Sequence, residues 1–230
     1  MNVVLNVVLP EVLSKAIQQS SEEDKRLIGE QIIHWAETYE SVKAEKGEQL
    51  AIAFMYHEID KAIEMHLTRS TRAVSCKKGC SICCEQYVSV SKDEATVLLA
   101  KLTESQTWID FKKAKSQSNH DTDSWVKQDK ETRTCMFLKD NACSIYEQRP
   151  AACRTYFVYS DPKLCDPANP DSVTVECPPM LAATTKQAGL WTAQNREGIF
   201  QTGLLQTGSL QIGSLPQMLL RARKEARDGN

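Results

Sequence analysis

The chain has 230 residues, a net charge of −2 and a sequence pI near 6.1, so no basic excess indicates a nucleic-acid-binding protein. Hydrophobic residues make up 41% and charged residues 25%, which is ordinary for a globular protein with one core, or one core and a helical appendage. The nine cysteines are the exceptional feature, and their odd number argues against a framework built from disulfides.

The first residues are unlike a secretory signal. The apolar run from Val3 to Leu9 has no positive residue before it and no small-residue cleavage site after it. No stretch approaches 18 apolar residues, so we expect no contact with a membrane. We therefore expect a cytoplasmic protein, and in that reducing compartment clustered cysteines indicate metal ligands before they indicate disulfides.

Residues 1–72 contain no cysteine and are predicted to be helical. A helix is expected from Pro10 to Gln19, Ser20 and Glu23 form a capping box for the next, and Gly47 separates it from a third. Apolar residues at helical spacing favour an intramolecular core, although the same stripes could bind a second copy or another protein partner. The stripes are Leu27, Ile28, Ile32, Trp35 and Tyr39, followed by Leu50, Ala53, Phe54, Ile59, Ile63 and Leu67.

The middle of the chain alternates short elements with loops. Residues 86–90 alternate like a strand, and Ser91 with Glu94 forms a capping box before a helix at 95–102. We expect an exposed loop at 116–124.

The stretch 134–146, TCMFLKDNACSIY, predicts a β-hairpin with a Lys-Asp-Asn turn, and Pro150 begins a short helix that carries Cys153. The five-residue repeat at 201–215 is too short for a solenoid, and the charged residues 221–230 indicate a solvated helix.

Four cysteines lie within ten residues, at Cys76, Cys80, Cys83 and Cys84. Thiolates are strong ligands for zinc and for iron–sulfur clusters, and a zinc ion or a cluster of this kind is held by four ligands. The stretch is either helical, with the thiols on one face, or a loop that leads from Gly79 into a helix. We expect Cys83 and Cys84 to point apart, so that the segment offers at most three ligands to one centre. The remaining ligands would then come from Cys135, Cys143, Cys153, Cys165 and Cys177, and the metal would join the two halves of the sequence.

These motifs resemble those of the YkgJ-type cysteine-cluster family. The resemblance rests on Cys-x3-Cys-x2-Cys-Cys and on the later Cys143-Ser-Ile-Tyr-Glu-Gln-Arg-Pro-Ala-Ala-Cys153-Arg154, and it spans roughly residues 75–180. It implies a zinc- or iron-chelating domain whose ligands include the first seven cysteines, with Cys165 and Cys177 matching its looser end. One departure is Met136, where the family usually has proline.

Two arginines flank Cys153 and are candidate cofactor-binding residues. Arg149 and Arg154 could offset the negative charge of several thiolates. The alternative is ordinary ion pairing with Glu147 or Asp161.

The predicted fold class is mainly α, with a small β-hairpin and irregular metal-organised loops. We expect an N-terminal helical region at 1–72, a cysteine-cluster metal-binding domain at 73–182 on which these helices pack, and a helical, Gly-punctuated tail at 183–230.

Three functions stay open. The first is a metal-binding protein with an iron–sulfur cluster or Zn²⁺. We favour the cluster, because zinc sites tend to use two Cys-x2-Cys pairs and only Cys80 and Cys83 form one. The second is a cluster-dependent enzyme, either a lysine methylase or another user of S-adenosylmethionine. The third is a metal carrier or redox sensor.

Overall fold

The computed structural model describes residues 10–77, 79–202 and 211–229. This part of the chain is mainly helical, with β1 paired to β4 and β2 paired to β3 in small sheets, which confirms the predicted fold class. Within it, no helix combines the length and the apolar character needed to cross a membrane. The contacts divide the chain into a helical unit, residues 1–69 and 179–212, and a cysteine unit, residues 70–178 and 213–230. The domain boundaries expected from the sequence stay a prediction.

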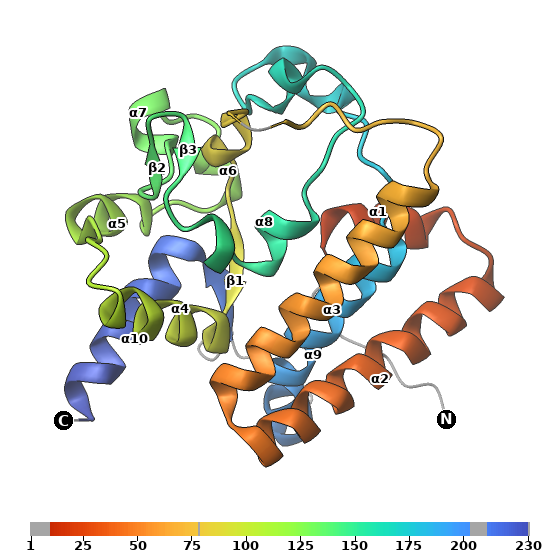
Figure 1. Ribbon diagram of the computed structural model, residues 1–230, viewed down its shortest axis with the longest axis horizontal. Helices are drawn as coiled ribbons and strands as arrows, with labels where there is room; N and C mark the ends of the chain where they lie inside the picture. Colours follow the sequence, from red (N-terminus) through yellow and green to blue (C-terminus); the bar gives the residue numbers. More distant parts are fainter. Residues whose placement is uncertain (1–9, 78, 203–210, 230) are drawn as a thin grey trace. The chain divides into compact units, whose positions relative to one another are not determined.

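The helical unit is built from long helices packed side by side (Figure 1). Helix α9 packs against the other three, and α2 packs against α3. Their buried faces show the apolar spacing of three and four residues expected of amphipathic helices. The helices are α1 (Glu11–Gln18), α2 (Glu22–Lys46), α3 (Glu48–Arg69) and α9 (Leu181–Thr202).

The helix boundaries in this unit follow local capping chemistry. Gly47, at a φ of 84°, ends α2 as predicted. The capping box predicted at Ser20 and Glu23 is wrong by one residue, because the hydroxyl of Ser21 accepts a hydrogen bond from the backbone N–H of Asp24 at 3.1 Å. Leu27 and Leu50 were also wrongly placed in the core, since they are 46% and 55% exposed.

Helices α2 and α9 approach closely at Gly189. A methyl group added there would lie 2.5 Å from Cβ of Trp35, so only glycine fits without a shift. One turn earlier, the Lys186 ammonium lies 2.8 Å from a carboxylate oxygen of Glu58 and 3.3 Å from the centre of the Trp35 ring. This contact holds three helices of the unit together.

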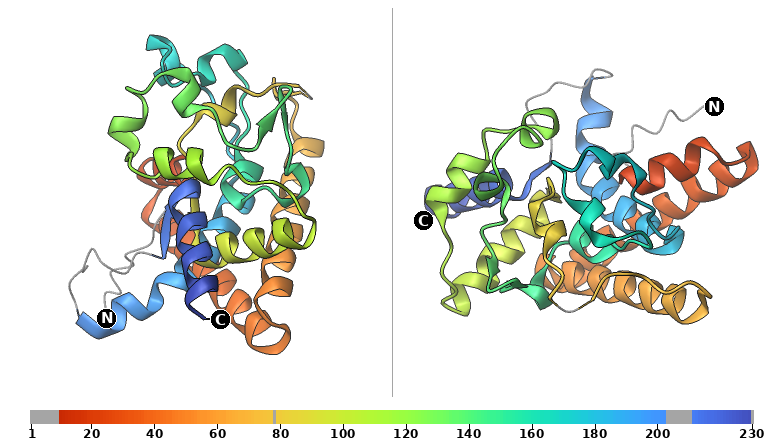
Figure 2. Two further views of the ribbon diagram at one scale, coloured as in Figure 1. Left: turned by 90° about the vertical axis from the view of Figure 1, so that its left-hand side faces the viewer. Right: turned by 90° about the horizontal axis from the view of Figure 1, so that it is seen from above.

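The cysteine unit consists of short elements joined by turns (Figure 2). Its α-helices are α4 (Lys92–Glu104), α5 (Phe111–Gln117), α6 (Thr122–Trp125), α7 (Lys130–Arg133), α8 (Ala151–Thr155) and α10 (Leu215–Asp228). The 3₁₀ turns are η1 (Ile82–Glu85), η2 (Tyr146–Gln148), η3 (Pro162–Cys165) and η4 (Pro170–Thr174). The strands are β1 (Ser89–Ser91), β2 (Leu138–Lys139), β3 (Ala142–Cys143) and β4 (Ile212–Ser214).

One apolar core holds this unit together. Helix α10 packs against α4, α5 and β1, and the backbone N–H of Leu215 donates to the carbonyl of Val88 at 2.8 Å. The core anchors the start of α4 and the base of the hairpin, which lie next to cysteine segments. Its buried members are Val90, Ala95, Leu98, Leu102, Ala114, Met136, Phe137, Ile145, Leu215, Met218, Leu219 and Ala222.

Local predictions in this unit are partly confirmed. The hairpin is present with Leu138 opposite Cys143, and the Ser91 capping box begins a helix that starts earlier, at Lys92. The strand expected at 86–90 is wrong in part, because β1 begins three residues later, at Ser89, and ends one residue later, at Ser91. The loop expected at 116–124 is wrong in part, because α5 and α6 extend into it. The repeat at 201–215 lies largely outside the described residues.

Candidate metal centre

The first cysteine segment is a loop that leads into a 3₁₀ turn, as the second of the two sequence interpretations proposed. Gly79 has a φ of +87°, in the left-handed region that glycine adopts without strain. The loop then tightens through a bond from the N–H of Cys80 to the carbonyl of Lys77 at 3.0 Å, before η1 places Cys83 and Cys84 in consecutive positions.

The thiols of Cys83 and Cys84 contact one another. We expected these neighbours to point apart, and that expectation is wrong: their side chains are hydrogen-bonded. A 3₁₀ turn spaces consecutive side chains about 120° apart, so this contact depends on how the two side chains are bent toward each other. The two thiols therefore lie within hydrogen-bonding distance of each other.

The predicted hairpin brings the next two cysteines to this segment. The N–H of Cys135 donates to the carbonyl of Cys84 at 2.8 Å, which joins the start of the hairpin to the end of η1. Asp140 and Asn141 have φ values of 49° and 57°, the backbone of a two-residue hairpin turn with both central residues left-handed. Cys143 follows in β3.

A buried glutamate positions the helix that carries Cys153. The Glu94 side chain is 1% exposed, and its carboxylate accepts bonds from the N–H of Ala151 at 2.8 Å and from the N–H and hydroxyl of Ser91 at 3.0 and 2.9 Å. Pro150 is the N-terminal cap of α8, as predicted from the sequence, and Cys153 lies in its first turn. The Glu94 carboxylate therefore fixes both the start of its own helix, α4, and the start of α8.

The last two cysteines are joined to the first segment by separate contacts. The Gln86 side-chain amide donates to the carbonyl of Cys165, and the Tyr156 hydroxyl donates to the Cys165 sulfur. The N–H of Ser75 donates to the carbonyl of Val158 at 2.8 Å, which holds the residue before Cys76 beside this region. A further bond of 2.7 Å, from Tyr159 to the carbonyl of Glu176, places the residue before Cys177 in the same region.

The Cys83 thiol lies close enough to thiols of the other cysteine segments to affect their pKa values. It interacts with the thiols of cysteines from the first segment, the hairpin, α8 and η3. These partners are Cys76, Cys135, Cys143, Cys153 and Cys165. Cys177 interacts with Tyr156, which also contacts Cys165.

The protein environment keeps several of these thiols protonated. Burial raises the pKa of Cys135 and of Cys165 to about 11, and it raises the pKa of Cys153 well above its ordinary value. The pKa of Cys83 is raised first by its hydrogen bond to Cys84 and then by burial. Thiolates are the donors that soft metals prefer. Because a metal binds the thiolate and not the thiol, each of these cysteines must release a proton when a metal binds to it.

The two candidate arginines play different parts. The Arg149 guanidinium lies 3.9 Å from the centre of the Tyr146 ring, and its charge lowers the pKa of Cys83, Cys143 and Cys153. Its Nε is buried without a hydrogen-bond partner among the described residues. Arg154 instead donates to the carbonyls of Arg149, at 2.9 Å, and of Glu147. Arg149 therefore acts on the thiols, and Arg154 holds the loop that carries Arg149.

The donor set fits a thiophilic metal by its chemistry. No disulfide joins the nine cysteines, all of which lie in the described ranges. Within those ranges, no three His, Cys, Asp or Glu side chains converge tightly enough to chelate an ion as they stand. Coordination would therefore require the thiols around Cys83 to draw closer together.

Sequence reasoning missed several residues that position the cysteines: Glu85, Gln86, Arg133 and Asp166. It identified Glu94 in a capping box but missed its bond to Ala151. Glu85 and Gln86 follow Cys84 directly, and this adjacency is a signal that could have identified them. No comparable signal marks Arg133, because it pairs with residues 48 and 33 positions away.

The comparisons with known proteins agree with this arrangement. Residues 75–177 match the model of the CxxCxxCC family, described as "Putative zinc- or iron-chelating domain". This part of the chain is similar to a CxxCxxCC domain. It begins one residue before Cys76 and ends at Cys177, so all nine cysteines lie inside it, although it covers slightly less than half of the chain. No curated protein and no solved structure matches the chain.

Proposed function

We propose that this protein binds an iron–sulfur cluster through the cysteines of its CxxCxxCC domain. The observation that carries the proposal is the packing of the cysteine segments around η1: the N–H of Cys135 donates to the carbonyl of Cys84 at 2.8 Å, and the Gln86 side chain donates to the carbonyl of Cys165. In agreement, the Cys83 thiol acts on the pKa of thiols from every neighbouring cysteine segment except the last. A group of thiols around one residue supports a shared centre, whereas separate zinc sites would favour separate groups of four.

The spacing of the ligands also favours the cluster over zinc. Structural zinc sites commonly use two Cys-x2-Cys pairs, and in this chain only Cys80 and Cys83 have that spacing. Cluster potentials depend on nearby charge and on hydrogen bonds to sulfur. Arg149 can supply both, because its charge acts on three of the thiols and its buried Nε has no partner among the described residues.

Metal analysis of the protein purified without air tests the proposal. We expect a brown sample with a visible absorbance band, and iron and acid-labile sulfide in near-stoichiometric amounts. A colourless sample with one or two zinc ions per chain would refute the cluster. A sample without iron or zinc would refute metal binding altogether.

Substitution of Cys153 tests the participation of the downstream motif. Cys153→Ser should lower both the metal content and the free energy of unfolding, because binding a structural metal is part of folding. Ala152→Ser is the matched control, since it introduces the same hydroxyl on α8 and keeps the thiol. Full metal retention in Cys153→Ser would contradict the proposed ligand set.

A second candidate function, reversible metal carriage, is supported by the surroundings of Cys80. This residue lines an open hollow of about 450 Å³ together with Lys77, Asp161 and Lys163, so a partner could reach the centre from that side. Transfer of radiolabelled metal to a competing chelator within minutes would support carriage. Retention over many hours would support a resident cofactor.

A further inference from the structure

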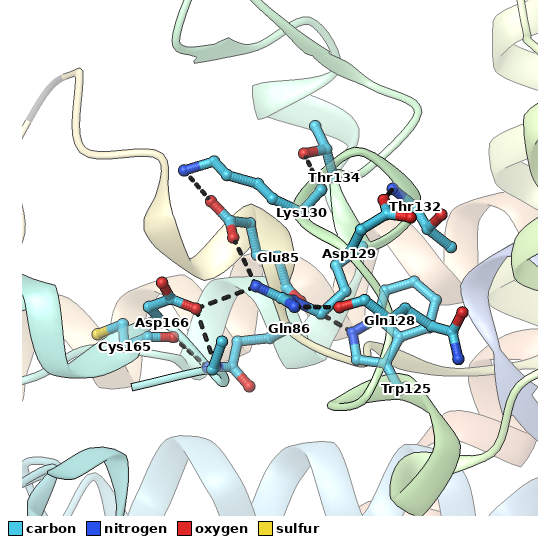
Figure 3. Close-up of polar contacts among 12 residues, drawn as sticks. Glu85, Gln86, Trp125, Gln128, Asp129, Lys130, Thr132, Thr134, Cys165 and Asp166 are labelled. Carbon is cyan, nitrogen blue, oxygen red and sulfur yellow. Dashed lines mark hydrogen bonds and ion pairs between the residues drawn. The ribbon is translucent and has the colours of Figure 1, made fainter. Parts of the chain in front are cut away.

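A buried arginine connects two of the cysteine segments. Arg133, at the end of α7, is 4% exposed, and its Nη2 lies 3.4 Å from Oε2 of Glu85 and 3.2 Å from Oδ1 of Asp166. Its Nη1 donates to the carbonyl of Gln128. Figure 3 draws the contacts of both carboxylates as dashed lines, and Lys130 approaches Glu85 from the exposed side at 2.9 Å.

The two carboxylates occupy equivalent places in the sequence. Glu85 directly follows Cys84, and Asp166 directly follows Cys165. The turns η1, which ends at Glu85, and η3, which ends one residue before Asp166, pack against each other. One guanidinium therefore bridges the residues next to two cysteines that lie 81 positions apart in the sequence.

Further bonds fix the same two backbones. The Gln86 side chain donates to the carbonyl of Cys165, and the indole N–H of Trp125 donates to the carbonyl of Glu85 at 2.8 Å. Asp166 also accepts a bond from the N–H of Ala168 at 2.9 Å, which orients its carboxylate. Each cysteine-bearing turn is thus held by a side-chain pair and by a backbone contact (Figure 3).

The physical chemistry of this network favours a positioning role over a purely stabilising one. A buried ion pair costs desolvation energy that its attraction barely offsets, so burial alone is weak support for a stabilising role. The Nε of Arg133 is also buried without a partner among the described residues. In metal-binding proteins generally, hydrogen bonds and ion pairs next to the ligands orient the ligating groups. The contacts of Arg133 are of this kind.

We propose that Arg133 is a positioning residue that holds the η1 cysteines and Cys165 at one metal centre by pairing with Glu85 and Asp166 at once. This inference rests on the proposed metal binding. It also assigns Cys165 to the same centre as Cys83 and Cys84.

The test uses the full-length protein purified without air. Arg133→Met removes the bridge at nearly constant length, and Asp166→Asn weakens only the η3 side if the first variant folds poorly. The control is Arg72→Met, which removes an exposed ion pair to Glu176, the residue before Cys177. Two quantities are measured: the rate of iron or zinc loss to a colorimetric chelator, and the alkylation of each cysteine by iodoacetamide, resolved by mass spectrometry.

We expect Arg133→Met to release metal about 10- to 100-fold faster, the range seen when outer contacts of a metal site are removed. Alkylation of Cys165 should rise about tenfold or more while that of Cys153 changes little, with a smaller shift in Asp166→Asn and none in Arg72→Met. Equal alkylation of all cysteines, or metal release at the wild-type rate in both variants, would overturn the inference. A wild-type protein without metal would refute the proposed function and this inference together, whereas metal-loaded variants that behave like wild type would refute the inference alone.

Discussion

Replacing Glu94 by glutamine tests how the fold positions Cys153. The carboxylate accepts from the N–H of Ala151 and from the N–H and hydroxyl of Ser91, all within 3.0 Å, at a site that is 1% exposed. The amide of glutamine keeps one accepting oxygen and turns the other side into a donor. At least one buried N–H therefore loses its acceptor.

The expected cost follows from these bonds. A buried donor left without a partner costs about 1–3 kcal/mol, and each remaining bond loses about 1 kcal/mol of charge assistance. We expect Glu94→Gln to lower the free energy of unfolding by about 2–4 kcal/mol. Because the Ala151 bond fixes the start of α8, metal affinity should fall by roughly tenfold as well.

Urea unfolding followed by circular dichroism, with metal analysis of the same samples, measures both effects. Glu104→Gln is the matched control, since it changes an exposed residue at the end of the same helix and should stay within about 0.5 kcal/mol of wild type. Equal stability of Glu94→Gln and Glu104→Gln would refute the proposed role of the buried carboxylate.

Two further predictions concern packing and protons. Gly189→Ala should destabilise the helical unit by about 1–3 kcal/mol, because the methyl group would lie 2.5 Å from Cβ of Trp35. A thermal unfolding midpoint of the variant equal to or above that of the wild type would contradict this. Metal affinity should rise with pH between 6.5 and 8.5, because burial raises the pKa of Cys135 and Cys165 to about 11, so both carry protons throughout this range and release them on binding. The expected slope is about tenfold per pH unit for each such thiol, and a pH-independent affinity in chelator competition would exclude these two as ligands.

Short-range signals allowed the local elements of the cysteine unit to be predicted. The hairpin turn depends on Asp140 and Asn141, whose side chains tolerate the left-handed backbone, and the start of α4 depends on Ser91 and Glu94, three residues apart. The error at Ser20 has a local cause too. Two adjacent serines each precede an acidic residue by three, and only the folded geometry shows that Ser21 is the cap.

Long-range contacts could not be predicted in the same way. Cys83 and Cys84 were expected to diverge because consecutive side chains diverge in regular helices and strands, whereas in the folded chain the two side chains bend toward each other and are hydrogen-bonded. The pairing of Arg133 with Glu85 spans 48 residues, and many other charges in the sequence are equally plausible partners. The sequence therefore identified the thiols, but the contacts that position them depend on the folded chain.

X-ray absorption at the edge of the bound metal tests the central claim most directly. We predict an iron edge with a first shell of about four sulfur atoms and a second shell containing iron, as expected for a cluster held by cysteines. A first shell made mainly of oxygen and nitrogen would contradict cysteine ligation, and a zinc edge with four sulfur neighbours would contradict the cluster.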